Sequence, residues 1–128
     1  MKWWFRRKPL ITEDNYGKLM MSFGRVVDRD PFVERPARAL AERVVEEHPE
    51  TVAAVDREMY GGSATYHLRL LAGSWIMASE GSVPRETAEV FEEAVAWKFG
   101  PLVKGSDKLP RLLSELARGE IERDTAQD

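Results

Sequence analysis

One stretch of the chain, residues 63–81, carries apolar side chains around almost its whole helical circumference. At 3.6 residues per turn, these side chains form two stripes on opposite sides of a helix. The first stripe consists of Ala64, Leu68, Leu71, Trp75 and Ala78, and the second of Tyr66, Leu70, Gly73 and Met77. A helix that is apolar on two faces must be covered on both. We therefore expect this segment to be the central, buried helix of the fold.

Both ends of this stretch carry residues that start and stop helices. The hydroxyl group of Ser63 can accept a hydrogen bond from a free backbone N–H group in the first turn. Gly81 can adopt the left-handed conformation that closes a helix. The sequence thus predicts a helix over about residues 63–80.

The other helical segments are apolar on one side only, as expected for helices that cover a core. They are predicted at about residues 12–29, 37–48, 50–60, 84–99 and 109–119. The first of them is predicted to bury Tyr16, Leu19, Met20, Phe23, Val26 and Val27. Asp30 and Pro31 are expected to lie between helices, and the second helix is expected to begin after Pro36.

The pattern indicates an all-α fold. Sustained alternation of apolar and polar residues is absent from the sequence, and so are the Asn-Gly and Asp-Gly pairs of tight hairpins. The 128 residues are 43% hydrophobic, which is sufficient for one core without disulfides or metal. We expect a compact single-domain bundle of five or six helices around the central helix. Residues 11–119 would form the helical domain, residues 1–10 an aromatic and basic arm, and residues 120–128 a polar, frayed tail.

Composition limits the chemistry and the location of the protein. The chain has no cysteine, which excludes disulfides, thiolate zinc sites and cysteine nucleophiles. A net charge of -3 argues against a surface built to bind nucleic acid. The longest apolar run, residues 70–78, is far shorter than the roughly 20 residues of a membrane-spanning helix. Because the amino terminus also lacks the apolar core of a secretory signal, we expect a cytoplasmic protein, with membrane association as an alternative.

The sequence lacks the familiar motifs of metal sites and enzymes. Neither of the two histidines has a glutamate three residues before it, as di-iron bundles require. Asp28, Asp30 and Glu34 have part of the spacing of a calcium loop, but Pro31 interrupts it and the central glycine is missing. We expect no metal ion, no cofactor and no enzymatic activity.

A helix-turn-helix is the one nucleic-acid motif that the spacing suggests. Residues 51–60, the Gly61-Gly62 pair and residues 63–71 supply a helix, a turn and a second helix. However, Arg57 occupies a position that normally holds a small residue, and basic residues are sparse nearby. We therefore do not expect DNA binding.

His67 is the best single candidate for a chemical or ligand-binding residue. Tyr66 and Arg69 lie close to it on the predicted central helix, and the three could form a polar pocket. The competing interpretation, which we favour, is a structural histidine, half buried and hydrogen-bonded to a backbone carbonyl group.

The amino-terminal arm has the most unusual composition in the chain. Three aromatic residues directly precede three basic ones, in the order Trp3, Trp4, Phe5, Arg6, Arg7 and Lys8. Tryptophan and arginine are enriched at the energetic centres of interfaces, so this arm is a candidate partner-binding site. Residues 1–8 could instead contact a membrane, because tryptophan prefers the headgroup region and basic residues attract anionic lipid. A third interpretation is that the aromatic residues fold back and close the core.

A second candidate surface is an arc of glutamates opposite the apolar face of the segment 84–99. It consists of Glu86, Glu89, Glu92 and Glu93. This arc could dock a basic partner, although such arcs are more often solvated faces.

The functional hypothesis is a small helical protein–protein interaction module that acts as an adaptor, an accessory subunit or an inhibitor. A peripheral membrane protein that uses the arm is the alternative. A small-molecule or enzymatic pocket around His67 is third. The sequence leaves homo-oligomerisation open.

Overall fold

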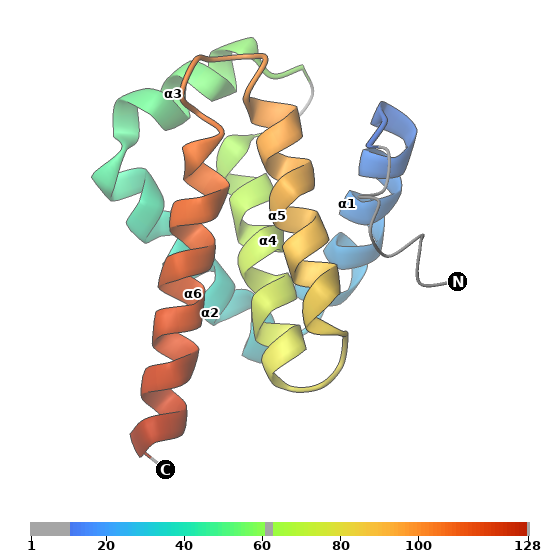
Figure 1. The fold of residues 1–128 in the computed structure, drawn as a ribbon, viewed down its shortest axis with the longest axis vertical. Helices are drawn as coiled ribbons and strands as arrows, with labels where there is room; N and C mark the ends of the chain where they lie inside the picture. Colours follow the sequence, from blue (N-terminus) through green and yellow to red (C-terminus); the bar gives the residue numbers. More distant parts are fainter. Residues whose placement is uncertain (1–10, 61–62, 128) are drawn as a thin grey trace.

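The computed structural model describes residues 11–60 and 63–127, with side chains up to Arg123. This part of the chain contains six helices and no strand (Figure 1). The helices are α1 (Glu13–Val27), α2 (Pro31–Glu47), α3 (Pro49–Glu58), α4 (Ala64–Ser79), α5 (Arg85–Phe99) and α6 (Lys108–Gln127). The prediction of an all-α bundle around a central helix is confirmed.

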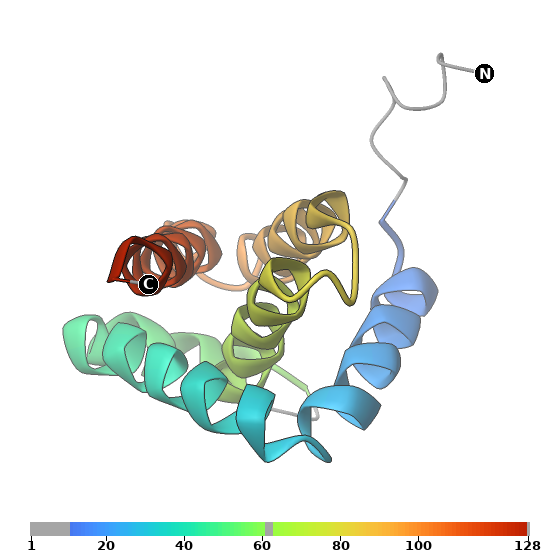
Figure 2. The same ribbon diagram turned by 90° about the horizontal axis from the view of Figure 1, so that it is seen from below.

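Helix α4 is the centre of the bundle and contacts all five other helices. It lies between α2 on one side and α5 with α6 on the other, and α1 lies beside it at the edge of the bundle (Figure 2). Both apolar stripes are covered: only Tyr66 and Ala78 among them are partly exposed. Trp75 and Met77, from opposite stripes, are 3% and 7% exposed.

The caps predicted for α4 are present. The Ser63 hydroxyl group accepts a hydrogen bond from the Tyr66 N–H group at 3.1 Å. Gly81 has a φ angle of 80°, which a residue with a side chain rarely adopts. A further bond fixes the start of α4, because the Ala64 N–H group donates to Oδ1 of Asp56 in α3 at 2.6 Å.

Helix α1 approaches α4 closely at one glycine. A Cβ atom placed on Gly73 would lie 2.5 Å from Cγ2 of Val27, a distance that real Cβ atoms do not reach. On the adjacent α5, the ring of Phe91 stacks on Phe23 of α1 with the ring centroids 4.9 Å apart. The missing side chain at Gly73 is therefore part of the packing that attaches α1 to the bundle.

The expected start of α2 was wrong. The helix begins at Pro31, before Pro36, because the Asp30 carboxylate caps it by accepting from the Phe32 N–H group at 3.0 Å. Proline suits the first helical position, because an N–H group there would have no hydrogen-bond acceptor within the helix. Pro36 lies inside the helix, where its missing N–H group removes one backbone hydrogen bond, and Ala37 next to it is fully buried.

Two further expectations on the helices were wrong. The last helix does not end near Gly119 but continues to Gln127, because contacts with the bundle support residues beyond the glycine. Nη1 of Arg43 donates to Oε1 of Glu120 at 2.8 Å, and Ile121 packs partly buried against the core. In α1, Val26 is 41% exposed, because the buried face is narrow and is filled by Phe23 and Val27.

Candidate functional site

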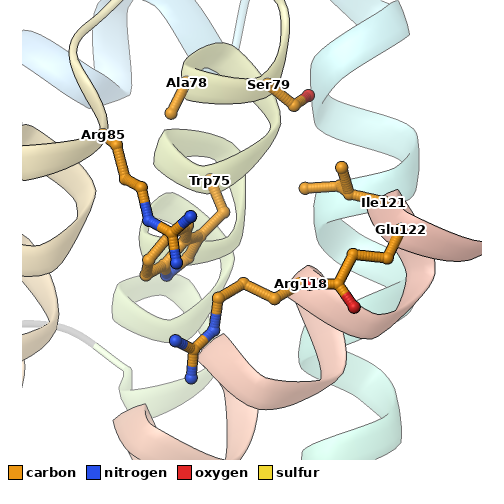
Figure 3. A pocket seen from close by; sticks show the side chains of 7 residues that line it. All are labelled: Trp75, Ala78, Ser79, Arg85, Arg118, Ile121 and Glu122. Atoms are coloured by element: carbon orange, nitrogen blue, oxygen red, sulfur yellow. The ribbon is translucent and has the colours of Figure 1, made fainter. Parts of the chain in front are cut away.

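A hollow of about 180 Å³ opens where α4, α5 and α6 meet, near the end of α4 (Figure 3). Its lining consists of Trp75, Ala78, Ser79, Arg85, Arg118, Ile121 and Glu122. These residues come from three successive helices, and their side chains meet only in the folded chain. It combines an apolar floor with charged residues, which is typical of a recognition site.

The floor of the hollow is held rigidly by a buried hydrogen bond. The Trp75 indole Nε1–H group donates to Oγ of Ser114 in α6 at 2.8 Å. Ser114 is fully buried and Trp75 is nearly so. Because an indole N–H group has no other hydrogen-bonding function, this contact fixes the ring orientation below the opening.

Two arginines converge on this ring. The guanidinium carbon of Arg85 lies 5.7 Å from the Trp75 ring, and that of Arg118 lies 5.3 Å from it. Figure 3 shows both side chains reaching from their helices toward the indole. Each such cation–π contact contributes about 0.5–1 kcal/mol at an exposed site.

The two arginines differ in how their charge is balanced. Arg85 forms an ion pair with Glu89 at 3.3 Å, but both side chains are more than half exposed, so the pair is weak. Nε of Arg118 donates to the Ser114 carbonyl oxygen at 3.3 Å. Across residues 11–60 and 63–123, no carboxylate lies within ion-pair distance of Arg118. Among the described residues, Arg118 is thus a cation of the hollow without an ion-pair partner.

A second hollow, of about 260 Å³, lies on the other side of α6. Its lining comes from α2, α4 and α6 and consists of Pro36, Ala39, Leu40, Arg43, Ile76, Ala117, Glu120 and Ile121. Ile121 also lines the first hollow, so one side chain separates the two. Beyond them, the last turns of α6 extend past the loop between α4 and α5 (Figure 1).

His67 is part of the core. Its ring is 7% exposed and stacks on Tyr16 of α1, with the centroids 5.5 Å apart. The Tyr16 hydroxyl group and Nδ1 of His67 share a hydrogen bond of 2.5 Å. Burial, with a smaller contribution from the Lys98 charge, lowers the pKa of His67 to about 4. A structural role fits this environment, but the favoured interpretation was wrong in two details: His67 is buried rather than half buried, and its partner is a side-chain hydroxyl group rather than a backbone carbonyl group.

The neighbours of His67 on α4 point to a different place. The Tyr66 hydroxyl group donates to Oδ2 of Asp28 at 3.0 Å, and Nη2 of Arg69 donates to Oδ1 of the same residue at 3.2 Å. Nη1 of Arg69 also lies 3.6 Å from Oε1 of Glu34 in α2. Burial and the bond to Asp28 raise the pKa of Tyr66. These contacts tie α4 to the corner between α1 and α2, so Tyr66 and Arg69 do not converge with His67 on one accessible point.

The remaining candidate residues are those of the acidic arc and those of the amino-terminal arm. In the acidic arc, Glu86 and Glu89 are exposed, whereas Glu92 and Glu93 are partly buried. The arm residues Trp3, Trp4, Phe5, Arg6, Arg7 and Lys8 lie outside the described residues.

Within the described residues, no group of three or more histidines and carboxylates is arranged to hold a metal ion. The same part of the chain contains no helix that is long and apolar enough to cross a bilayer.

Sequence reasoning missed the hollow between the arginines. Trp75 appeared only as a core residue, and Arg118 lies in a segment without a local motif. One signal was available: Arg85 is the first residue of α5, where the helix dipole disfavours a positive charge. The unfavourable interaction of this cation with the dipole is partly balanced by its ion pair with Glu89. Comparisons of the chain with protein-family models, with curated proteins and with solved structures find no match.

Proposed function

We propose that this chain is a helical protein–protein interaction module, an adaptor, accessory subunit or inhibitor, and that its partner contacts the surface around the second half of α6. The observation that carries the proposal is the pair of hollows on either side of Ile121. A partner that follows α6 can place one side chain in each.

The sizes of the hollows favour a protein partner over a small molecule. Drug-sized ligands and cofactors occupy pockets of about 300–1,000 Å³. The two hollows measure about 180 and 260 Å³, which suits single side chains. Tryptophan and arginine are also the residue types that contribute most to protein interfaces, and both are present in the first hollow.

Blocking the second hollow from its rim tests the proposal. Ala39 lines this hollow and is exposed on α2, so Ala39→Arg fills the opening without disturbing the core. Ala53 is an exposed alanine of α3 that lines neither hollow, so Ala53→Arg is the matched control. The measurement is quantitative affinity capture from cells. We expect the wild type and Ala53→Arg to capture the same proteins, and we expect Ala39→Arg to lose them.

Two results would contradict the proposal. The first is an identical set of captured proteins for Ala39→Arg and Ala53→Arg. The second is a loss of capture on deletion of residues 1–8 together with full capture by Ala39→Arg, which would assign the contact to the arm. Circular dichroism of each variant would confirm that the helices are intact.

A further inference from the structure

The charges around Trp75 identify the kind of partner that the first hollow accepts. We infer that the hollow lined by Arg85 and Arg118 binds a single carboxylate on an acidic segment of the partner protein, with an apolar residue of that segment packed over Ala78 and Ile121. This inference rests on the proposed interaction function and specifies its chemistry.

The first step is the unusual placement of two positive charges. Both guanidinium groups lie within 6 Å of the centroid of one indole ring, and both side chains line the same hollow. Arg118 has no carboxylate partner in the described chain, and the partner of Arg85 is an exposed glutamate. An anion in the hollow would accept charge-assisted hydrogen bonds from the arginines that line it.

The start of α5 adds to the positive potential. Arg85 is its first residue, and the residue before it, Pro84, makes no side-chain cap. The first turn of a helix carries a partial positive charge from its free N–H groups. An anion held by Arg85 would therefore also interact favourably with the helix dipole.

The residues that line the hollow favour one negative charge rather than several. Arg85 and Arg118 contribute two positive charges, and Glu122 and the Arg85 partner Glu89 contribute two negative charges, so Arg118 is the one cation of the lining without a carboxylate at ion-pair distance among the described residues. A doubly charged phosphate would exceed this balance, and the net charge of -3 on the whole chain disfavours a polyanion. A carboxylate side chain matches the charge.

The floor of the hollow gives the second requirement. Ala78 and Ile121 provide a partly exposed apolar surface beside the arginines, and the nearly buried Trp75 ring lies beneath it. A glutamate has an aliphatic stem that can lie on this surface while its carboxylate reaches the rim, and an adjacent leucine or isoleucine would extend the contact toward Ile121. The chemistry recognised is thus an acidic residue next to an aliphatic one.

Nuclear magnetic resonance titration of the full-length ¹⁵N-labelled chain tests this inference. The probe is the peptide acetyl-Ala-Leu-Glu-Leu-Ala-amide, and its control has glutamine in place of glutamate. We expect the Trp75 indole resonance, identified by its loss in Trp75→Phe, to shift saturably with the glutamate peptide. The glutamine peptide should bind at least about tenfold more weakly, since a hydrogen bond to a charged group contributes about 1.5–3 kcal/mol.

Substitutions identify the groups that bind. Arg85→Gln and Arg118→Gln keep the length of the side chain and should each weaken binding of the glutamate peptide about tenfold. Arg38→Gln is the matched control, because Arg38 is a half-exposed arginine of α2 that lines neither hollow, and it should leave the affinity unchanged.

Each failure has its own signature. Equal binding of the two peptides, unchanged binding by Arg118→Gln, or no saturable shift with the glutamate peptide would overturn the carboxylate assignment. Inorganic phosphate that produces the same shift and displaces the peptide at equal concentration would show a simple anion site and would also overturn it. In all these cases the proposed function stands if Ala39→Arg still loses captured proteins, and it fails if that variant does not.

Discussion

The close approach of α1 to α4 makes Gly73→Ala a sharp test of the packing. In an open helix, replacing glycine with alanine stabilises the protein by about 1 kcal/mol through helix propensity. At Gly73 the new Cβ atom would lie 2.5 Å from Cγ2 of Val27, which is fully buried and has no free space to enter. Overpacking of this kind costs about 1–3 kcal/mol. We therefore expect a net loss of up to about 2 kcal/mol, or roughly 8 °C in the melting temperature of a domain of this size.

Gly17→Ala is the matched control for this prediction. Gly17 is also a helical glycine, but a Cβ atom there meets nothing within 4 Å, so the substitution should stabilise α1 by about 1 kcal/mol. Urea unfolding followed by circular dichroism would measure both variants. In a Val27→Ala background the obstructing methyl group is absent, and Gly73→Ala should become stabilising. If Gly73→Ala and Gly17→Ala stabilise the wild-type chain equally, the reasoning on the α1–α4 contact is wrong.

Other predictions concern buried polar groups. The pKa of His67 is about 4 in the folded chain and near 6.5 when unfolded, so the unfolded state binds more protons between these values. The free energy of unfolding should decrease by up to about 3 kcal/mol as the pH falls from 6.5 to 4. Urea unfolding of His67→Gln across this range should show a smaller decrease. Equal pH dependence of the wild type and His67→Gln would refute this prediction. Ser114→Ala leaves the buried Trp75 indole N–H group without its acceptor and should cost about 1–3 kcal/mol in thermal unfolding. A loss below 0.5 kcal/mol, as at a surface site, would contradict this. Asp56→Ala removes the hydrogen bond to the Ala64 N–H group and should lower the free energy of unfolding in urea by about 1 kcal/mol. Asp56→Asn keeps an acceptor oxygen and should lower it less. Equal stability of the two variants would show that the hydrogen bond contributes nothing.

The sequence predicted the parts of the fold that depend on local pattern. The double stripe of α4 was sufficient to place it at the centre, since a helix apolar on two faces has no other stable position. The apolar arc of α5 was also predicted correctly, and all its members are buried: Ala88, Phe91, Ala94, Val95 and Phe99. Burial of one face follows directly from helical periodicity.

The boundaries that were wrong depend on competing signals or on distant contacts. At α2, the sequence analysis treated Pro31 as a helix breaker, but the Asp30 cap makes Pro31 the first helical residue. At α6, Gly119 and the polar residues after it are a typical helix end, but contacts with α2 and with the core stabilise a longer helix. No local pattern reveals an ion pair between residues 43 and 120.

The candidate site was hidden for the same reason. Trp75, Arg85 and Arg118 belong to three helices, and only the folded arrangement brings them together. Likewise, His67 finds its hydrogen-bonding partner 51 positions away, at Tyr16. Sequence reasoning identified His67 as unusual but could not supply that partner.

The position of α4 has a consequence for how the protein opens. Because α4 contacts all five other helices, its amide hydrogens can exchange with solvent only when the whole bundle loses its packing. Their exchange rates should report the global free energy of unfolding. The last turns of α6, which extend past the loop between α4 and α5, can exchange by local fraying without any such event. The bundle of α1 to α6 should therefore unfold as a single cooperative unit, except for the end of α6, which can unfold independently.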